Sequence, residues 1–353
     1  MRKTNVIYRM PAEWERHVGT WIAWPHLKEH WPGYFGSIPS VFGQMAEALS
    51  HSEKIFVCVN DEKMENEARE LLQKEQPGVI WDNVFFYHIP TNSSWMRDHG
   101  PIFVQGPDGL NITDWIFNGW GNRWPQWKYD LDDEVPQRVA EQFKLPLVQP
   151  GLVLEGGSID VNGKGTLLTT ESCLLSPTRN PHLSRREIEE ALESYLGATH
   201  VIWLKEELKG DDTSGHIDDL ARFVSPDIVV ACVERNKEDE NYEVLKNNFE
   251  LLKNSTDQDG KPLNIITLPM PAPVMHEGQR CPASYANFYI GNQVVLLPTY
   301  RCKQDDEATE ILEKYFPNRK IVGIDCFDLV WGLGAIHCST QQQPKPALDR
   351  TDR

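Results

Sequence analysis

One cysteine near the end of the chain lies in a stretch that favours a reactive thiol. Cys338 follows the glycine-containing run GLGAIH and precedes the polar run STQQQ. A cysteine that serves packing usually stands inside an apolar segment, as Cys58 does in IFVCV. A thiol in a loop among polar neighbours is better placed to act as a nucleophile. The sequence therefore predicts that Cys338 is catalytic.

A second dense stretch, GDDTSGHIDD over residues 210–219, contains a histidine and several acids. In an extended segment, residues two apart point to the same side, so His216 and Asp218 are expected to face one site. A histidine beside a thiol can activate it and later move protons to the leaving group and from water. The alternative is a loop histidine that only hydrogen-bonds neighbouring acids.

Two more carboxylates stand next to residues that indicate a site. Asp98 follows Trp95 and Arg97 just before an apolar strand, and Glu155 ends the apolar run LVL before two glycines. A carboxylate at the mouth of a buried strand is costly unless it is paired. The alternatives are an internal pair between Arg97 and Asp98 and a structural ion pair at Glu155.

One thiol, one histidine and three carboxylates suit a guanidinium better than an amide. A guanidinium is planar and always cationic, and its paired N–H groups match carboxylates. A cysteine protease or acyltransferase would need an oxyanion hole instead of a ring of acids. Attack on a guanidine or amidine carbon is therefore favoured over attack on an amide. Transfer of an amidino group and a non-catalytic guanidine- or polyamine-binding protein stay open as alternatives.

The composition is that of a globular protein with an acidic surface. The 353-residue chain has 40% hydrophobic residues and a formal net charge of −17, which argues against nucleic acid or an anionic membrane as partner. We expect no signal peptide and no membrane span. Seven cysteines at irregular spacings indicate reduced thiols in a cytoplasmic protein. No metal is expected, because no second histidine or cysteine follows His216 at ligand spacing.

The chain repeats one pattern of elements. A strand over 18–24, a helix over 38–51 and strands over 55–60 and 84–89 come first. Hairpins then recur over 98–117, 155–170, 218–233 and 287–298, separated by helices at 184–196, 240–253 and 305–316 and by strands at 200–204, 264–268 and 320–324. About five such units at a roughly even period predict radial repetition. A single domain over 1–353 is preferred, with an ordinary α/β sheet as the alternative.

Together these motifs resemble the agmatine deiminases, within the guanidine-modifying superfamily that also includes arginine deiminases and bacterial peptidyl-arginine deiminases. The resemblance covers nearly the whole chain. It rests on PAEWE at 11–15, WMRDHGP at 95–101, LEGG at 154–157, GDDTSGHID at 210–218, SYANFYI at 284–290 and IHC at 336–338. Each motif is weak alone, and the ordered set is specific. The lead-in at 332–335 has fewer glycines than is usual in the family.

The resemblance implies an α/β fold, namely a five-bladed α/β propeller with pseudo-fivefold symmetry (the pentein fold), that needs no cofactor. By motif match, Cys338 resembles the family's nucleophile and His216 its general acid and base. Glu155 resembles the carboxylate that partners the histidine and contacts the guanidinium. The motif match also assigns the guanidinium-binding pair and two further residues of the substrate channel: Asp98 and Asp218, then Trp95 and Asp212.

The same resemblance implies an activity. Agmatine would be hydrolysed to N-carbamoylputrescine and ammonia through a covalent cysteine thiouronium, a step of putrescine biosynthesis from arginine. A peptidyl-arginine deiminase would use the same core on a protein chain. The expected partner is a small cationic guanidine, without nucleic acid or membrane, and a homodimer is compatible with the family.

Overall fold

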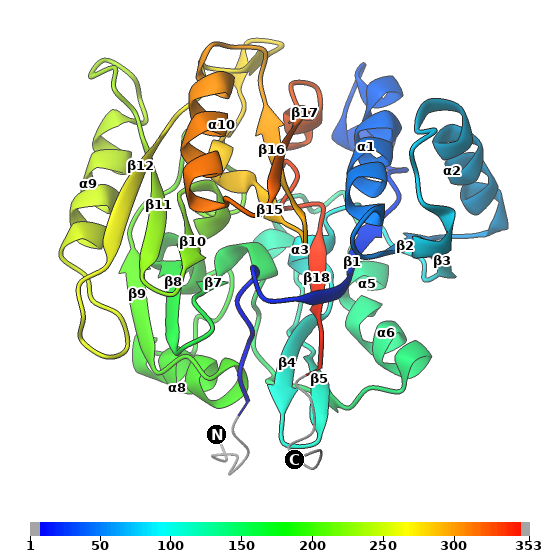
Figure 1. Cartoon of the computed structure of the whole chain (residues 1–353). Helices are drawn as coiled ribbons and strands as arrows, with labels where there is room; N and C mark the ends of the chain where they lie inside the picture. The colour runs from blue at the N-terminus through cyan, green and yellow to red at the C-terminus, as the bar shows by residue number, and fades with distance from the viewer. Residues whose placement is uncertain (1–7, 347–353) are drawn as a thin grey trace.

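The strands form small sheets that share one plan (Figure 1). A computed structural model describes residues 8–346, and within them five sheets have three or four strands each. Four of these sheets consist of an antiparallel hairpin whose second strand pairs in parallel with a third strand. They are β4-β5-β6 (Ile102–Gly106, Gly109–Thr113, Leu147–Val148), β7-β8-β9 (Asp160–Val161, Thr166–Thr170, His200–Leu204), β10-β11-β12 (Ala221–Ser225, Ile228–Val233, Asn264–Pro269) and β15-β16-β17 (Tyr289–Ile290, Val294–Thr299, Lys320–Asp325).

The two ends of the described chain meet in the fifth sheet. The C-terminal strand β18 (Gln341–Pro344) pairs antiparallel with β1 (His17–Ala23), as the red and blue strands of Figure 1 show. β1 continues in parallel with β2 (Lys54–Val59) and then β3 (Val84–His88). A separate two-stranded ribbon consists of β13 (Met275–His276) and β14 (Gln279–Arg280).

The longer helices lie between the strands, where their apolar faces are buried. They are α1 (Ile38–Ser50), α2 (Glu62–Glu75), α6 (Val135–Phe143), α8 (Arg185–Leu196), α9 (Tyr242–Lys253) and α10 (Gln304–Tyr315). One-turn helices are α3 (Met96–His99), α4 (Gly119–Asn122), α5 (Asp130–Asp133) and α7 (Glu171–Leu174). The capping box that predicts the start of α8 is present, with Ser184 and Glu187 bonded reciprocally. Among the described residues, none of the helices has the length and apolar character that crossing a bilayer requires.

The predicted hairpins and helices are present, but several details differ. Each hairpin starts a few residues later than predicted, because its first polar residue lies in or beside a helical turn; Asp218 is thus in a 3-10 turn and not in the extended segment expected for it. The strand expected to reach residue 117 ends at Thr113. The helix α6 and strand β6 were not predicted, because residues 118–150 show no sustained periodicity. The strand β18 was also missed, since its three glutamines are polar and its pairing with β1 is entirely long-range.

Five short turns position the candidate site, one before the first strand of each sheet. Asp98 lies in α3 before β4, Asp218 lies in the 3-10 turn Ile217–Asp219 before β10, and Cys338 precedes β18. The remaining two turns, Gly156–Ser158 and Tyr285–Asn287, precede β7 and β15. Successive turns from α3 to Tyr285–Asn287 touch one another, so residues far apart in sequence converge.

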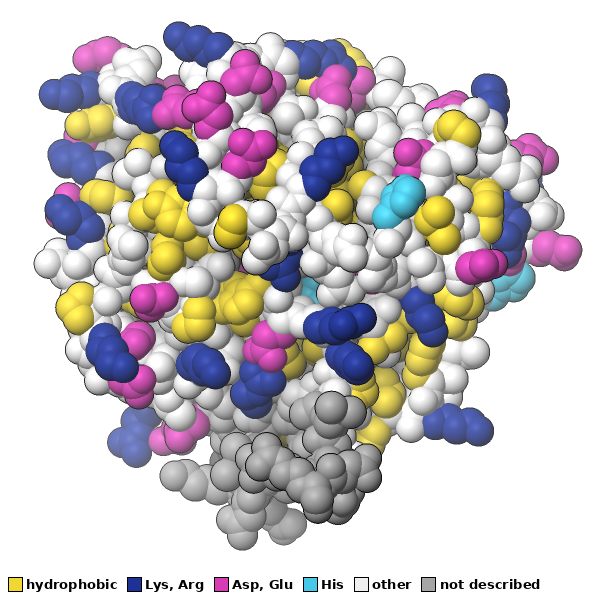
Figure 2. Space-filling model, in the orientation of Figure 1, with side chains coloured by type: hydrophobic (Ala, Val, Ile, Leu, Met, Phe, Trp, Pro, Cys, Tyr) yellow, Lys and Arg dark blue, Asp and Glu magenta, His cyan; other side chains and the backbone are white. Residues whose placement is uncertain are grey.

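The surface carries both signs of charge. Figure 2 shows Lys and Arg side chains interspersed with Asp and Glu over one face of the molecule. The net charge of −17 therefore does not form a single patch on that face.

Candidate active site

An aromatic cavity opens above Cys338. Five tryptophans line it, together with acids that the sequence analysis singled out; the lining residues are Glu29, His30, Pro32, Trp95, Asp98, Trp120, Trp124, Trp127, Asp212, Thr213, Gln279, Trp331, Gly332, Leu333, Gly334 and Cys338. Among the described residues, no lysine or arginine lines this cavity. Its charged walls are acidic, which suits a cationic ligand.

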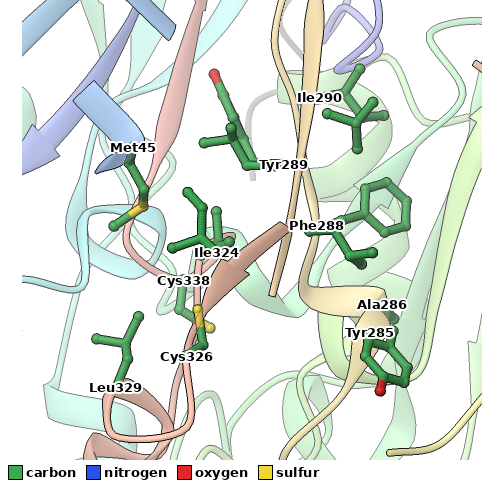
Figure 3. Close-up of a cluster of buried hydrophobic side chains, with 14 of the residues drawn as sticks. Met45, Tyr285, Ala286, Phe288, Tyr289, Ile290, Ile324, Cys326, Leu329 and Cys338 are labelled. Carbon is green, nitrogen blue, oxygen red and sulfur yellow. The ribbon is translucent and has the colours of Figure 1, made fainter. Parts of the chain in front are cut away.

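Cys338 lies where the buried core meets the cavity. Figure 3 shows it beside apolar side chains of the core, which include Ile324, Cys326 and Leu329. The amide of Asn287 donates to Cys338 Sγ at 3.1 Å, and the carbonyl of the same side chain accepts from the Cys338 backbone N–H at 3.3 Å. Asn287 therefore holds both the backbone and the sulfur of the predicted nucleophile.

The surroundings of Cys338 favour its neutral thiol. Burial raises its pKa well above the usual value, and the negative charges of Asp218, Asp219 and Asp98 raise it further. Cys338 Sγ lies 3.7 Å from Asp218 Oδ2. A cation placed between these carboxylates and the sulfur would oppose the same effects, since it stabilises a thiolate.

Asp98 is held between two donors and the histidine. Its Oδ1 accepts from the Gly157 N–H at 3.2 Å and its Oδ2 from Trp120 Nε1 at 2.9 Å. Oδ1 also lies 3.6 Å from His216 Nδ1. Burial and the nearby charge of Asp218 raise the pKa of Asp98 to about 6, although His216 and Trp120 lower it.

His216 has a carboxylate on one side and a second thiol on the other. Burial lowers its pKa, but Asp98, Cys173 and Asp218 outweigh burial and hold the pKa well above the usual value. Neither ring nitrogen has a geometric hydrogen bond within residues 8–346, although Cys173 lies beside the ring. The predicted acid–base residue is therefore a buried imidazolium. Neither His216 nor Asp218 is among the residues that line the cavity; both lie just beneath it, next to Asp98 and Cys338.

Glu155 lies behind His216 and does not line the cavity. Its side chain is fully buried, and its Oε1 accepts from Arg179 Nε at 2.7 Å. Arg179 also donates to the Thr213 carbonyl at 2.8 Å, so it ties Glu155 to the loop that precedes His216. The predicted pairing with the histidine fits this placement, whereas a contact of Glu155 with the guanidinium stays a prediction.

Glu155, Cys173 and His216 bring three potential metal ligands within 4.8 Å of one another. Spacing along the chain did not predict this cluster, because Cys173 lies in α7, far from His216 in the sequence. Glutamate, cysteine and histidine are ligand types that zinc uses. Here Glu155 is already paired with a buried guanidinium, so we expect the cluster to orient His216 and to hold no metal.

Gly157 lets the acid and the histidine approach each other. A Cβ at this position would lie 2.6 Å from His216 Nδ1 and 2.7 Å from Asp98 Oδ1. The side chains of the site leave no room for a methyl group there, and its φ is not in the left-handed region.

We therefore expect Gly157→Ala to lower kcat/KM by about 100-fold or more, because displacement of about 1 Å is enough to disrupt reacting geometry. Steady-state kinetics and a thermal melt would check this. Gly36→Ala is the matched control, since a Cβ there meets nothing within 4 Å. Normal kinetics of Gly157→Ala would contradict the close approach.

Trp95 and Asp212 both line the cavity, as the resemblance implies. Trp95 Nε1 donates to His30 Nδ1 at 3.2 Å. His30 can accept because burial, and secondarily His26, lower its pKa to about 3, so it is neutral. Asp212 Oδ2 accepts from Trp124 Nε1 at 2.5 Å. Burial raises the pKa of Asp212 to about 7, although the Trp124 hydrogen bond lowers it.

None of the three arginines near the motifs lines the cavity, although the charge of Arg123 acts on Asp212. Arg97 donates to Gln342 at 2.7 Å, and Arg222 donates to Asp160 at 3.0 Å. Arg123 is exposed and does not line the cavity. None of these three is placed to hold a ligand carboxylate in the cavity.

Several residues of the site were not found from the sequence. They are the loop tryptophans, the amide that holds the cysteine and the buried pairs beneath the site: Trp120, Trp124, Trp127, Asn287, Cys173, Arg179, Glu13 and His337. Asn287, Glu13 and His337 lie in the motifs SYANFYI, PAEWE and IHC, which were the available signals for them. The others depend on contacts between distant segments.

Known proteins are similar to this chain in sequence and in fold. The model of the Porphyromonas-type peptidyl-arginine deiminase family matches residues 9–344. A "Putative agmatine deiminase" of Mycoplasma capricolum subsp. capricolum is 38% identical, with 95% of each chain covered.

Solved structures agree with these matches. The agmatine deiminase of Enterococcus faecalis has a TM-score of 0.88 at 33% identity, with 96% of both chains covered. A substrate-bound agmatine deiminase of C. jejuni has a TM-score of 0.87 at 32% identity, with 98% of both covered. The mixed α/β fold is thus that of these enzymes. The chain therefore belongs to the Porphyromonas-type peptidyl-arginine deiminase family and is an enzyme of that family.

Proposed function

We propose that the protein hydrolyses the guanidinium of agmatine to N-carbamoylputrescine and ammonia, a step toward putrescine. The observation that carries this proposal is the cavity, whose charged lining residues are Glu29, Asp98 and Asp212 beside a cysteine at its floor. Agmatine is a dication without a carboxylate. It matches the acids that line the cavity and requires no arginine clamp, unlike free arginine.

In the first half-reaction, the guanidinium binds Asp98 and Asp218 with its carbon over Cys338. Its charge offsets the carboxylates, so the thiol loses its proton to solvent. The thiolate forms a C–S bond with the guanidinium carbon. His216, whose raised pKa keeps it protonated, gives a proton to one amino group, the C–N bond breaks, and ammonia leaves. A covalent S-alkylthiouronium on Cys338 remains.

In the second half-reaction, the now neutral His216 takes a proton from a water molecule that attacks the thiouronium carbon. The C–S bond breaks, the thiolate returns, and the ureido product forms. The second proton of the water is released to solvent, where it converts the ammonia from the first half-reaction to ammonium. Glu155 and Cys173, which lie against His216, orient the imidazole through both steps. No redox change occurs.

We also propose how the sheets are arranged and where in the cell the protein acts. The shared plan of the five sheets and the convergence of their preceding turns support a five-bladed α/β propeller that forms a single catalytic domain over 1–353. Seven unpaired cysteines support a cytoplasmic location. The homodimer and the lack of nucleic-acid partners stay predictions.

Ammonia release tests the substrate. We expect turnover of agmatine, and little or none of free arginine or an arginine-containing peptide. Asp212 is proposed to hold the distal amine, so Asp212→Asn should lower kcat/KM for agmatine by about 10- to 100-fold, because one charge-assisted bond is lost. Efficient peptide turnover, unaffected by Asp212→Asn, would instead favour peptidyl-arginine deimination. Binding without turnover would favour a guanidine-binding protein.

The acid limb of the pH profile is a further prediction. Asp212 and Asp98 have raised pKa values of about 7 and about 6, and each binds a cation only above its pKa. We expect kcat/KM for agmatine to fall about tenfold per pH unit below about pH 7, and more steeply below about pH 6. Asp212→Asn should remove the upper step. A flat profile between about pH 5 and 8 would contradict both assignments.

A further inference from the structure

A buried network of charges lies beneath the candidate site and outside its cavity. Glu13, in the segment before β1, is 5% exposed. Its Oε2 lies 2.8 Å from His337 Nε2, 2.9 Å from Arg222 Nη2 and 3.4 Å from Arg97 Nη2. Its Oε1 accepts from the Ile290 N–H at 2.8 Å. One carboxylate near the N-terminus thus contacts β10, β15 and α3, in addition to His337.

His337 joins this network to the predicted guanidinium site. Its Nδ1 lies 2.7 Å from Asp218 Oδ2, and its Nε2 contacts Glu13 on the opposite side. Burial raises the pKa of each carboxyl, but the charges of Arg222 and His337 hold the pKa of Glu13 well below its usual value, and His337 likewise lowers that of Asp218. Each ring nitrogen of His337 therefore faces a carboxylate oxygen at hydrogen-bond distance, which places both nitrogens to donate.

The pairing leaves one Asp218 oxygen free. Oδ2 is bonded to His337, whereas Oδ1 is buried without a hydrogen-bond partner among the described residues. A carboxylate held by one oxygen cannot rotate freely, and its other oxygen then keeps one direction. An unpaired buried carboxylate oxygen is costly unless a donor reaches it in the working state.

We propose that Glu13 and His337 are positioning residues for Asp218, on which the proposed function rests. Glu13 fixes the His337 ring through Nε2, and His337 Nδ1 in turn holds Asp218 Oδ2, which leaves Oδ1 for the substrate guanidinium. His337 directly precedes Cys338, and its N–H donates to the Asn287 side chain at 2.9 Å, so the same residue connects the acid to the nucleophile loop.

Other charged groups also face Asp218, and they define the background of any pH measurement. The cations are His216, Arg97 and Arg222, and the anions are Asp98 and Asp219. His337 is the cation that hydrogen-bonds Asp218 directly. Its removal is therefore expected to raise the pH at which Asp218 takes up a proton.

The kinetic test uses His337→Gln, which removes the cation, and Glu13→Gln, which keeps an acceptor without charge. We expect kcat/KM for agmatine to fall about 100-fold in His337→Gln and about tenfold in Glu13→Gln, with KM raised in both. The acid limb should move to higher pH in His337→Gln. Glu13→Asp keeps the carboxylate, so its kcat/KM should be higher than that of Glu13→Gln.

The matched control is Glu53→Gln. Glu53 is equally buried and also contacts a histidine, His17 Nδ1 at 3.2 Å, and Thr20, but it does not contact Asp218. It should lose stability without a change in the pH profile. If His337→Gln and Glu13→Gln shift the melting temperature and leave KM and the acid limb as in Glu53→Gln, the network is structural only and the proposal is overturned.

A substrate-free readout separates this proposal from the proposed function. In wild-type protein, nitrogen NMR of labelled histidines should show a proton on both His337 nitrogens, because each faces a carboxylate oxygen, and Glu13→Gln should change the signal of Nε2. A singly protonated His337 in the wild type would overturn the pairing even if agmatine is turned over. A doubly protonated His337 in a protein inactive on agmatine would overturn the function alone.

Discussion

Cys338→Ala is expected to lose at least about 10⁴-fold in kcat on agmatine, because no C–S bond can form and the remaining groups supply only binding and orientation. Agmatine affinity should be kept or improved, since the carboxylates that receive the guanidinium are unchanged. An ammonia assay and calorimetric titration would measure the two quantities. In the wild type, acid quenching during turnover should trap an adduct of agmatine less ammonia on Cys338.

A second cysteine provides the matched control. Cys326 is buried in the same cluster as Cys338 but is not among the residues that line the cavity. Cys326→Ala should keep turnover and lose stability, because it creates a small cavity in the core. If Cys338→Ala kept normal turnover, the covalent mechanism would be wrong.

Asp98→Asn is expected to cost about 100- to 1,000-fold in kcat/KM, through both a higher KM and a lower kcat. A buried cation that loses its carboxylate partner is destabilised by several kcal/mol, and His216 loses the nearest charge that keeps it protonated. Asp98 is a clearer test than Asp218, because a change at Asp218 also breaks the pair with His337.

Asp114→Asn serves as the control for this prediction. Asp114 is buried and accepts from Gln137 at 3.1 Å and Gln149 at 2.8 Å, outside the cavity. The two asparagine variants should destabilise the fold to a similar degree, and only Asp98→Asn should change the kinetics. If Asp98→Asn and Asp114→Asn had the same kcat/KM, the assignment of Asp98 to the site would be wrong.

The acid-rich chemistry was predictable because each reactive residue stands next to a turn with its own sequence signature. Cys338, His216, Asp98, Glu155 and Asp218 each lie in a short glycine- or acid-containing motif. The hairpins that follow these motifs have local turn signals, so the elements that carry the residues could also be predicted. Local patterns of this kind survive without tertiary information.

Contacts that join distant segments could not be predicted. Whether Arg97 and Arg222 face the cavity depends on pairs with Glu13 and Asp160, which are far away in sequence. The polar strand β18 is stable because its backbone pairs with β1 and Trp21 Nε1 donates to Gln343 at 3.0 Å. The residues next to a position in the chain do not indicate which distant residues it will contact.

By itself, the sequence determined the reactive residue types, the repeated strand plan and the acidic character of the site. Tertiary structure alone decided the partners of Arg97 and Arg222, the tryptophan walls, the raised pKa of His216 and the two carboxylates that flank His337. The physical reason is that turns and strand patterns depend on interactions within a few residues. Charge states in a buried site depend on which groups the folded chain brings within a few ångströms.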